Sequence, residues 1–295
     1  FLKKENTVPV FVGSGATKIY DNMGKMKNIG LDFSIDYNKQ ITNDFFLSFK
    51  GTFTYAHNTI LERDEPPFRL YPNLSGVGHS YGVPLIYVSE GLFKDQEDLD
   101  NHAQQTLGYQ PWVGDIKYQD MPDVNGEYNG IIDGNDRVYM GNPDVPEIVY
   151  GFGSSMKYKN WDFSFFFQGV AKTSILMSGF HPFGNEAVRG VMKFIVDDYW
   201  SESNPNLNAA YPRLTRVTNA NNEAASSFWL RNGAFLKLKN AEVGYTFKMF
   251  RAYINGANLL TFSPFKYWDP EMGGGSGMKY PTQRVFNLGI QFTFK

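Results

Sequence analysis

The chain has 295 residues, a formal net charge of −2, no cysteine and an aromatic content of 17%. Without an excess of basic residues there is no electrostatic footprint for nucleic acid, and without cysteine there is no disulfide framework, thiolate metal site or cysteine nucleophile. No apolar stretch approaches the roughly 20 residues of a membrane-spanning helix, so a helical membrane protein is excluded as well.

Two amphipathic strands are predicted early in the chain. Residues 30–38 place Leu31, Phe33, Ile35 and Tyr37 on one face and polar residues on the other, and residues 45–56 repeat the pattern after a short turn. Alternation with a period of two residues is typical of a strand with one apolar face. The two segments are predicted to form an antiparallel hairpin.

The middle of the chain alternates between long polar stretches and further strands. The periodicity fades over residues 58–147, where weaker patterns favour a strand at 81–88 and a short helix at 95–107. Strands are predicted at 148–158 and 161–170, and a second long connection at 171–226 contains a predicted helix at 187–200. Long connections alternating with short turns are typical of an outer-membrane barrel, whereas structureless loops of this length are uncommon in a compact soluble domain.

The chain closes with four predicted strands, at residues 228–238, 240–248, 250–260 and 284–294. In the last of them one face holds Phe286, Leu288, Ile290, Phe292 and Phe294, and the other holds Asn287, Gln291 and Thr293. A strand that crosses a membrane needs about 9–11 residues with apolar side chains facing lipid. The eight clear strands therefore indicate a sheet whose apolar face must be covered by lipid or by a second protein layer.

Nine motifs in register resemble the C-terminal part of the SusC/RagA family of TonB-dependent outer-membrane transporters. They are NMGKMKNIGLDF (22–33), GDIKYQD (114–120), IIDGNDR (131–137), GNPD (141–144), YGFG (150–153), FFFQGV (165–170), YPRL (211–214), SSFWLRNGAFLKLKN (226–240) and NLLTF (258–262). The resemblance implies an all-β fold: residues 1–295 would form the C-terminal portion of a barrel of roughly 22 antiparallel transmembrane strands with long extracellular loops.

The resemblance also implies a function and partners. Family members lie in the outer membrane, import large nutrients, mainly oligosaccharides and sometimes peptides, and pair with a SusD-like surface lipoprotein. The TonB complex would act through a plug that this chain lacks, and the start at Phe1, without an initiator Met or signal segment, agrees with a piece of a longer protein. No enzymatic activity is implied.

Candidate substrate contacts are aromatic and polar. Trp112, Tyr118, Trp200, Tyr211 and Trp268 lie outside the clear strands, where a flat ring can stack on a sugar or pack between loops. Asp162, Gln168, Glu242 and Asn287 are predicted to face the lumen. The four histidines have no ligand spacing and no nucleophile motif occurs, so we expect no catalytic site.

One acidic turn has the composition of a calcium loop. Asp123, Asn125, Glu127 and Asp133 supply oxygens at close spacing, which is what Ca²⁺ requires. Tyr128 and Asn129 interrupt the ligand register, however. We therefore expect no cofactor and favour a turn in which Asp133 and Asp136 accept hydrogen bonds from backbone N–H groups.

Two alternatives to the transporter are compatible with the sequence. A soluble β-sandwich, either a carbohydrate-binding module or a glycosidase, would bury Trp161, Phe163, Phe165 and Phe167 in a core, whereas a barrel would expose them to lipid. A passive porin without TonB coupling has the same strand pattern but is disfavoured by the motifs.

Overall fold

The computed structural model describes residues 2–8, 17–178 and 192–294. The chain divides into two compact units. The sheet unit comprises residues 29–57, 142–175 and 231–295, and the loop unit comprises residues 1–28, 58–141 and 176–230.

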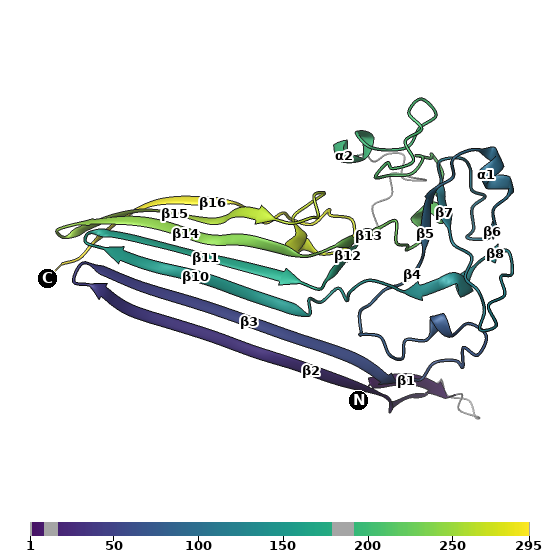
Figure 1. Cartoon of the computed structure of the whole chain (residues 1–295), viewed down its shortest axis with the longest axis horizontal. Coiled ribbons are helices and arrows are strands. Elements are labelled where there is room, and N and C mark those ends of the chain that lie inside the picture. The colour runs from purple at the N-terminus through teal and green to yellow at the C-terminus, as the bar shows by residue number, and fades with distance from the viewer. Residues whose placement is uncertain (1, 9–16, 179–191, 295) are drawn as a thin grey trace. The chain divides into compact units, whose positions relative to one another are not determined.

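One antiparallel sheet dominates the described chain (Figure 1), with eight strands in the order β1-β2-β3-β10-β11-β14-β15-β16. From β3 to β16 each strand runs antiparallel to its neighbour. The strands are β1 (Leu2–Val8), β2 (Thr17–Thr42), β3 (Phe45–Glu62), β10 (Ile148–Tyr158), β11 (Trp161–Ala171), β14 (Phe235–Phe247), β15 (Phe250–Phe262) and β16 (Val285–Phe292).

The connections between these strands differ in length at the two ends of the sheet. Two-residue turns join β2 to β3, β10 to β11 and β14 to β15 at one end. Long connections follow β3, β11 and β15 at the other end. The asymmetry of short turns and long loops predicted from the sequence is therefore present, and the connections 63–147 and 172–234 leave the sheet at the same end.

From β3 to β16, apolar side chains lie opposite apolar side chains on one face of the sheet, and the polar side chains lie on the other face. Trp161 lies opposite Tyr158 and Tyr245, and Phe163 lies opposite Met156 and Val243. On the other face Asp162 lies opposite Lys157 and Gly244. Because cross-strand partners share a face, the sheet has one apolar face and one polar face.

Among the described residues, the large side chains of the apolar face remain exposed. Trp161 is 55% exposed and Phe163 is 40% exposed, and Leu288 and Ile290 of β16 are 78% and 66% exposed. A soluble sandwich would bury these rings in its core. The exposure agrees with the barrel prediction and not with the sandwich alternative.

Three sequence predictions of secondary structure are wrong. The helix predicted at 95–107 is only α1 (Gln96–Asp100), and β6 (Gln104–Gln105) is a strand within the predicted range. The predicted break between residues 238 and 240 is a bulge within the single strand β14, where Lys239 has no partner in either neighbouring ladder. In the part of residues 187–200 that the structure describes, the helix is only α2 (Lys193–Val196), and residues 187–191 lie outside the described residues. The helix ends there because the following backbone pairs with residue 211 instead: the Trp200 N–H donates to the Tyr211 carbonyl, and the Tyr211 N–H donates to the Asp198 carbonyl.

The loop unit is built from short elements around its own core, which includes Ile86, Phe93, Ile116 and Tyr118. Its short strands are β4 (Leu85–Tyr87) with β9 (Arg137–Tyr139), β5 (Ser89–Leu92) with β7 (Ile116–Tyr118), and β6 (Gln104–Gln105) with β8 (Ile131–Ile132). Strands β12 (Ser174–Leu176) and β13 (Leu230–Asn232) form a further pair. The helices are α1 (Gln96–Asp100) and α3 (Ala220–Glu223), with 3₁₀ turns η1 (Pro72–Leu74), η2 (Gly134–Asp136) and, in the sheet unit, η3 (Pro270–Met272). None of the helices in the described residues has the length and apolarity needed to span a membrane.

Candidate functional site

A network of charged and amide side chains crosses the polar face near the short turns. The Arg251 guanidinium donates to both Asp162, with Nε at 3.0 Å from Oδ2, and Glu242, with Nη2 at 2.6 Å from Oε1. Asn255 Nδ2 donates to Glu242 at 3.1 Å, and Asn287 Nδ2 donates to Asn255 at 2.9 Å. The predicted lumen residues Asp162, Glu242 and Asn287 thus share the polar face of β11, β14, β15 and β16.

A second cluster lies on the same face toward the long connections. Lys237 lies opposite Gln168 in the sheet and is fully buried. Its Nζ is 2.7 Å from Asp269 Oδ2 and 2.5 Å from Glu271 Oε2, and Lys239 Nζ is 2.6 Å from Glu271 Oε1. These ion pairs tie the connection 263–284 to the polar face.

The electrostatics of this cluster follow from its contacts. Burial by itself would raise the pKa of Asp269, but the hydrogen bond from Lys237 and the charge of that lysine lower it below its ordinary value. The pKa of Glu271 is lowered against the same burial by Lys237 and Lys239. Both carboxylates are therefore held ionised against the two ammonium groups.

Sequence reasoning missed this cluster, although a signal for it exists. Lys237 and Lys239 alternate with Leu236 and Leu238 in a strand, which places two lysines on the face opposite the leucines. Charged residues on the inner face of a strand require partners, because a buried unpaired charge is costly. The partners come from η3, about 30 positions later, and no local pattern points to them.

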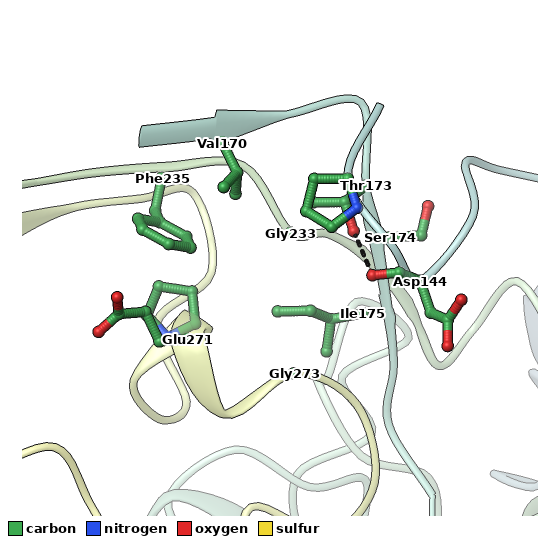
Figure 2. A pocket seen from close by; sticks show the side chains of 11 residues that line it. Asp144, Val170, Thr173, Ser174, Ile175, Gly233, Phe235, Glu271 and Gly273 are labelled. Atoms are coloured by element: carbon green, nitrogen blue, oxygen red, sulfur yellow. Dashed lines mark hydrogen bonds between the residues drawn. The ribbon is translucent and has the colours of Figure 1, made fainter. Parts of the chain in front are cut away.

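A cavity of about 280 Å³ lies beside this cluster. Figure 2 shows Val170, Phe235 and Ile175 directed into it from β11, β14 and β12. Pro146 and Pro270 complete its apolar lining, and Gly233 and Gly273 contribute backbone. The carboxylates of Asp144 and Glu271 flank the cavity and point out of it on opposite sides.

The five aromatic candidates fall into two groups. The ring of Tyr118 is fully buried, with its hydroxyl donating to the Asn221 carbonyl at 2.6 Å, and Trp200 is 4% exposed above Gly114. Tyr211 is buried as well. These rings pack the loop unit and offer no face to a ligand in this structure. Trp112 is 63% exposed, and Trp268 is half-buried beside Phe265.

Trp112 is held in place by a buried polar network. Its backbone N–H donates to Asp115 Oδ2 at 2.8 Å, and the same carboxylate accepts from Arg213 Nη2 at 2.9 Å. The Arg213 guanidinium lies 6.0 Å from the indole ring centre of Trp112, and its pKa is raised despite burial, mainly by the hydrogen bond to Asp115. Asn222 Nδ2 supports Asp115 from the other side at 2.9 Å.

The acidic turn is closed by its own backbone. Asp123 Oδ1 accepts from the N–H groups of Asn125 and Glu127 at 2.8 and 3.0 Å. The Asp133 carboxylate accepts a hydrogen bond from the N–H of Asn135, and the Asp136 carboxylate accepts one from the N–H of Asp133 at 2.7 Å. These two bonds form a capping box on η2. The described residues contain no group of three or more metal-ligating side chains with suitable geometry. Asp133 and Asp136 thus accept hydrogen bonds from backbone N–H groups, as predicted from the sequence.

An exposed apolar face on an antiparallel sheet, together with a polar face crossed by ion pairs, defines the class of transmembrane β-barrel proteins. No protein-family model matches the chain. Individual proteins do match it. The TonB-dependent receptor P26 of Formosa agariphila is 29% identical over 100% of this chain and 32% of its own length. The TonB-dependent receptor SusC of Bacteroides thetaiotaomicron is 24% identical over 98% of this chain and 28% of its own.

Solved structures agree on the fold. The RagAB peptide transporter matches with a TM-score of 0.66 and 20% identity, over 94% of this chain and 30% of that chain. Its "open-open" state matches with a TM-score of 0.66 over 98% of this chain. The chain spans about a third of the length of the curated relatives it matches. Over its whole length the chain is therefore similar to TonB-dependent receptors, and its fold is similar to that of the RagAB transporter.

Proposed function

We propose that the protein imports large nutrients across the outer membrane, driven by the TonB complex through a plug region outside this chain. Residues 1–295 would form the C-terminal part of its barrel. The main support for the proposal is the strand register from β3 to β16, which places apolar side chains on one exposed face of the sheet and polar side chains on the other. Similarity to TonB-dependent receptors over the whole chain supports it.

The two faces have separate tasks in this proposal. The apolar face contacts lipid, because apolar side chains carry no desolvation penalty in hydrocarbon. It includes Trp161, Phe163 and the apolar residues of β16. The polar face, with its Arg251 and Lys237 clusters, lines the lumen. Of the predicted substrate contacts, Asp162 and Gln168 lie on this face, although Asp162 is already engaged by Arg251.

The long connections are proposed to be extracellular and to contact a SusD-like lipoprotein. The support is the resemblance to SusC and to the RagA component of RagAB. The substrate is proposed to be an oligosaccharide or a peptide. The exposed Trp112 ring favours the first, since a held indole can stack on a sugar. The similarity to RagAB, a peptide transporter, favours the second.

A growth experiment tests the import function. Deletion of the gene for the full-length receptor is expected to abolish growth on one oligosaccharide or peptide mixture as sole carbon source, and a plasmid copy is expected to restore it. Loss of TonB should have the same effect as deletion. Growth that survives loss of TonB but not loss of the receptor would indicate a passive porin. Unchanged growth of the deletion strain on every nutrient tested would contradict the import function.

A further inference from the structure

The cavity between β11, β12, β14 and η3 is mostly apolar in its lining. Val170 and Phe235 lie on the polar face of the sheet, so they are apolar exceptions among polar neighbours such as Gln168 and Lys237. Ile175 closes the cavity from β12 and is 2% exposed, while Pro146 and Pro270 close it from two connections. An apolar hollow on an otherwise polar surface indicates a binding position rather than lipid contact, because lipid meets the opposite face.

The polar groups around this cavity are already occupied. Thr173 Oγ1 donates to the Asp144 carbonyl at 2.9 Å (Figure 2), and Ser174 Oγ accepts from the Asn142 N–H at 2.9 Å. The Gly233 N–H donates to the Thr173 carbonyl at 2.9 Å. Glu271, as described above, is bound to Lys237 and Lys239. Few hydrogen-bonding groups therefore remain for a ligand inside the cavity.

This chemistry distinguishes between substrate classes. A sugar ring presents hydroxyl groups, and each one buried without a partner carries a desolvation penalty. A hydrocarbon side chain carries no such penalty and gains by leaving water. At about 280 Å³ the cavity is also at the small end of ligand sites, so it suits one side chain rather than a whole ligand.

We propose that this cavity is a subsite for one apolar amino-acid side chain of a peptide substrate. The inference rests on the proposed import function. It states that the substrate group bound in this cavity belongs to a peptide and not to an oligosaccharide. Val170, Ile175 and Phe235 would contact the side chain. The Lys237 ion cluster would act as a positioning element, because it holds η3 and thereby Pro270 against the cavity.

A host–guest peptide series tests the proposal. The probes are Gly/Ser-based decapeptides with one central guest residue, either Ser, Val, Leu or Phe, and binding to the full-length receptor in detergent is measured by calorimetry. We expect the Leu guest to bind about tenfold more tightly than the Ser guest. Ile175→Trp fills the cavity and should remove this difference. Val145→Trp is the matched control, since Val145 is 71% exposed next to the cavity residue Pro146 and does not line the cavity.

A second variant covers the case in which Ile175→Trp does not assemble. Ile175→Ala enlarges the cavity and should shift the preference from Val toward Phe, which a purely structural role of Ile175 would not do. Equal binding of Ser and Leu guests, or a Leu preference that survives Ile175→Trp, would overturn the proposal. Growth that depends on the receptor for oligosaccharides alone would also overturn it while leaving the import function intact. Failure of receptor-dependent growth on both nutrient classes would instead refute the import function.

Discussion

Lys237 shows how a single buried charge can organise a whole connection. It is fully buried, yet it meets two carboxylates from the 263–284 connection and receives a third contact from the ring of Phe235 at 6.0 Å. A buried ammonium is tolerated only when it is paired and hydrogen-bonded. The sequence shows where the lysine must point but not which residues meet it.

Replacing Lys237 with Met should free the 263–284 connection. The change leaves Asp269 without its lysine partner and leaves Glu271 with Lys239 alone. Removing one member of a buried pair costs about 3–5 kcal/mol. We expect trypsin to cleave the full-length receptor faster after Lys279, an exposed residue of that connection. Lys50→Met removes an exposed lysine from the polar face and is the control. Equal cleavage rates in the two variants would contradict the anchoring role.

Acid should loosen the same connection. The folded pKa values of Asp269 and Glu271 lie below their ordinary values of 3.8 and 4.5. A lowered folded pKa adds stability above the ordinary pKa, and this stability is lost as the pH falls through the folded value. Hydrogen exchange of residues 269–273, corrected for its intrinsic pH dependence, should therefore stay slow above the ordinary pKa values of 3.8 and 4.5 and accelerate as the pH falls below them. Lys237→Met should show fast exchange both above and below these values.

Two glycines with the same backbone conformation offer a matched test of the loop unit. Gly114 and Gly126 have φ values of 84° and 83°, where a side chain is strained. A Cβ at Gly114 would lie 2.2 Å from the Trp200 ring, whereas a Cβ at Gly126 would meet nothing within 4 Å. Gly114→Ala should therefore be destabilising by about 1–3 kcal/mol more than Gly126→Ala, the added cost of overpacking. Proteolysis of the 63–147 connection measures this, and equal susceptibility would show that Trp200 can move aside without cost.

At the scale of elements, strand β16 gives the clearest test of which face of the sheet contacts lipid. Leu288 is 78% exposed and Ile290 is 66% exposed on the apolar face, while Asn287 bonds to Asn255 on the polar face. Leu288→Arg or Ile290→Arg should cost about 2–4 kcal/mol if the site lies near the bilayer midplane. Gln291→Arg, on the polar face, should cost much less. The measurement is the urea midpoint of the full-length receptor folded in vesicles, and equal shifts for the two faces would remove the assignment.

Strand periodicity predicted the strands of the sheet well, because two-residue alternation survives in every strand with one apolar face. Residues 148–158 were predicted with the observed bounds of β10. The prediction failed at Lys239, where a bulge keeps Lys237, Lys239 and Glu242 on one face and so breaks the alternation without ending the strand. It also failed within the long connections, where structure depends on long-range pairs such as Asp115 with Arg213.

Candidate site residues were harder to predict than strands. The two-residue alternation of the strand is enough to predict that Asp162 and Gln168 lie on the polar face. The aromatic candidates cannot be predicted in this way, because nothing local separates the exposed Trp112 from the buried Trp200 and Tyr118. The apolar cavity combines Val170, Ile175 and Phe235 with Pro146 and Pro270, which lie far apart in the sequence.

At the scale of the whole molecule, the sheet begins with β1 and ends with β16, and no pairing between these two strands closes it within the described residues. An open edge in lipid leaves backbone groups unpaired, at several kcal/mol for each group. Further strands must therefore cover both edges in the membrane. This requirement fits a chain that spans about a third of the relatives it matches.

The sidedness of the connections gives the last prediction. Because the connections 63–147 and 172–234 leave the sheet at the end opposite the short turns, both should face the cell exterior, and the turn at Asn160 should face the periplasm. The chain has no cysteine, so Val124→Cys, Val217→Cys and Asn160→Cys introduce single thiols at exposed positions. A membrane-impermeant maleimide should label the first two in intact cells and Asn160→Cys only after the outer membrane is permeabilised. Labelling of Asn160→Cys in intact cells, with protection of both connection sites, would reverse the orientation and place the proposed peptide subsite near the wrong end of the barrel for capture from outside.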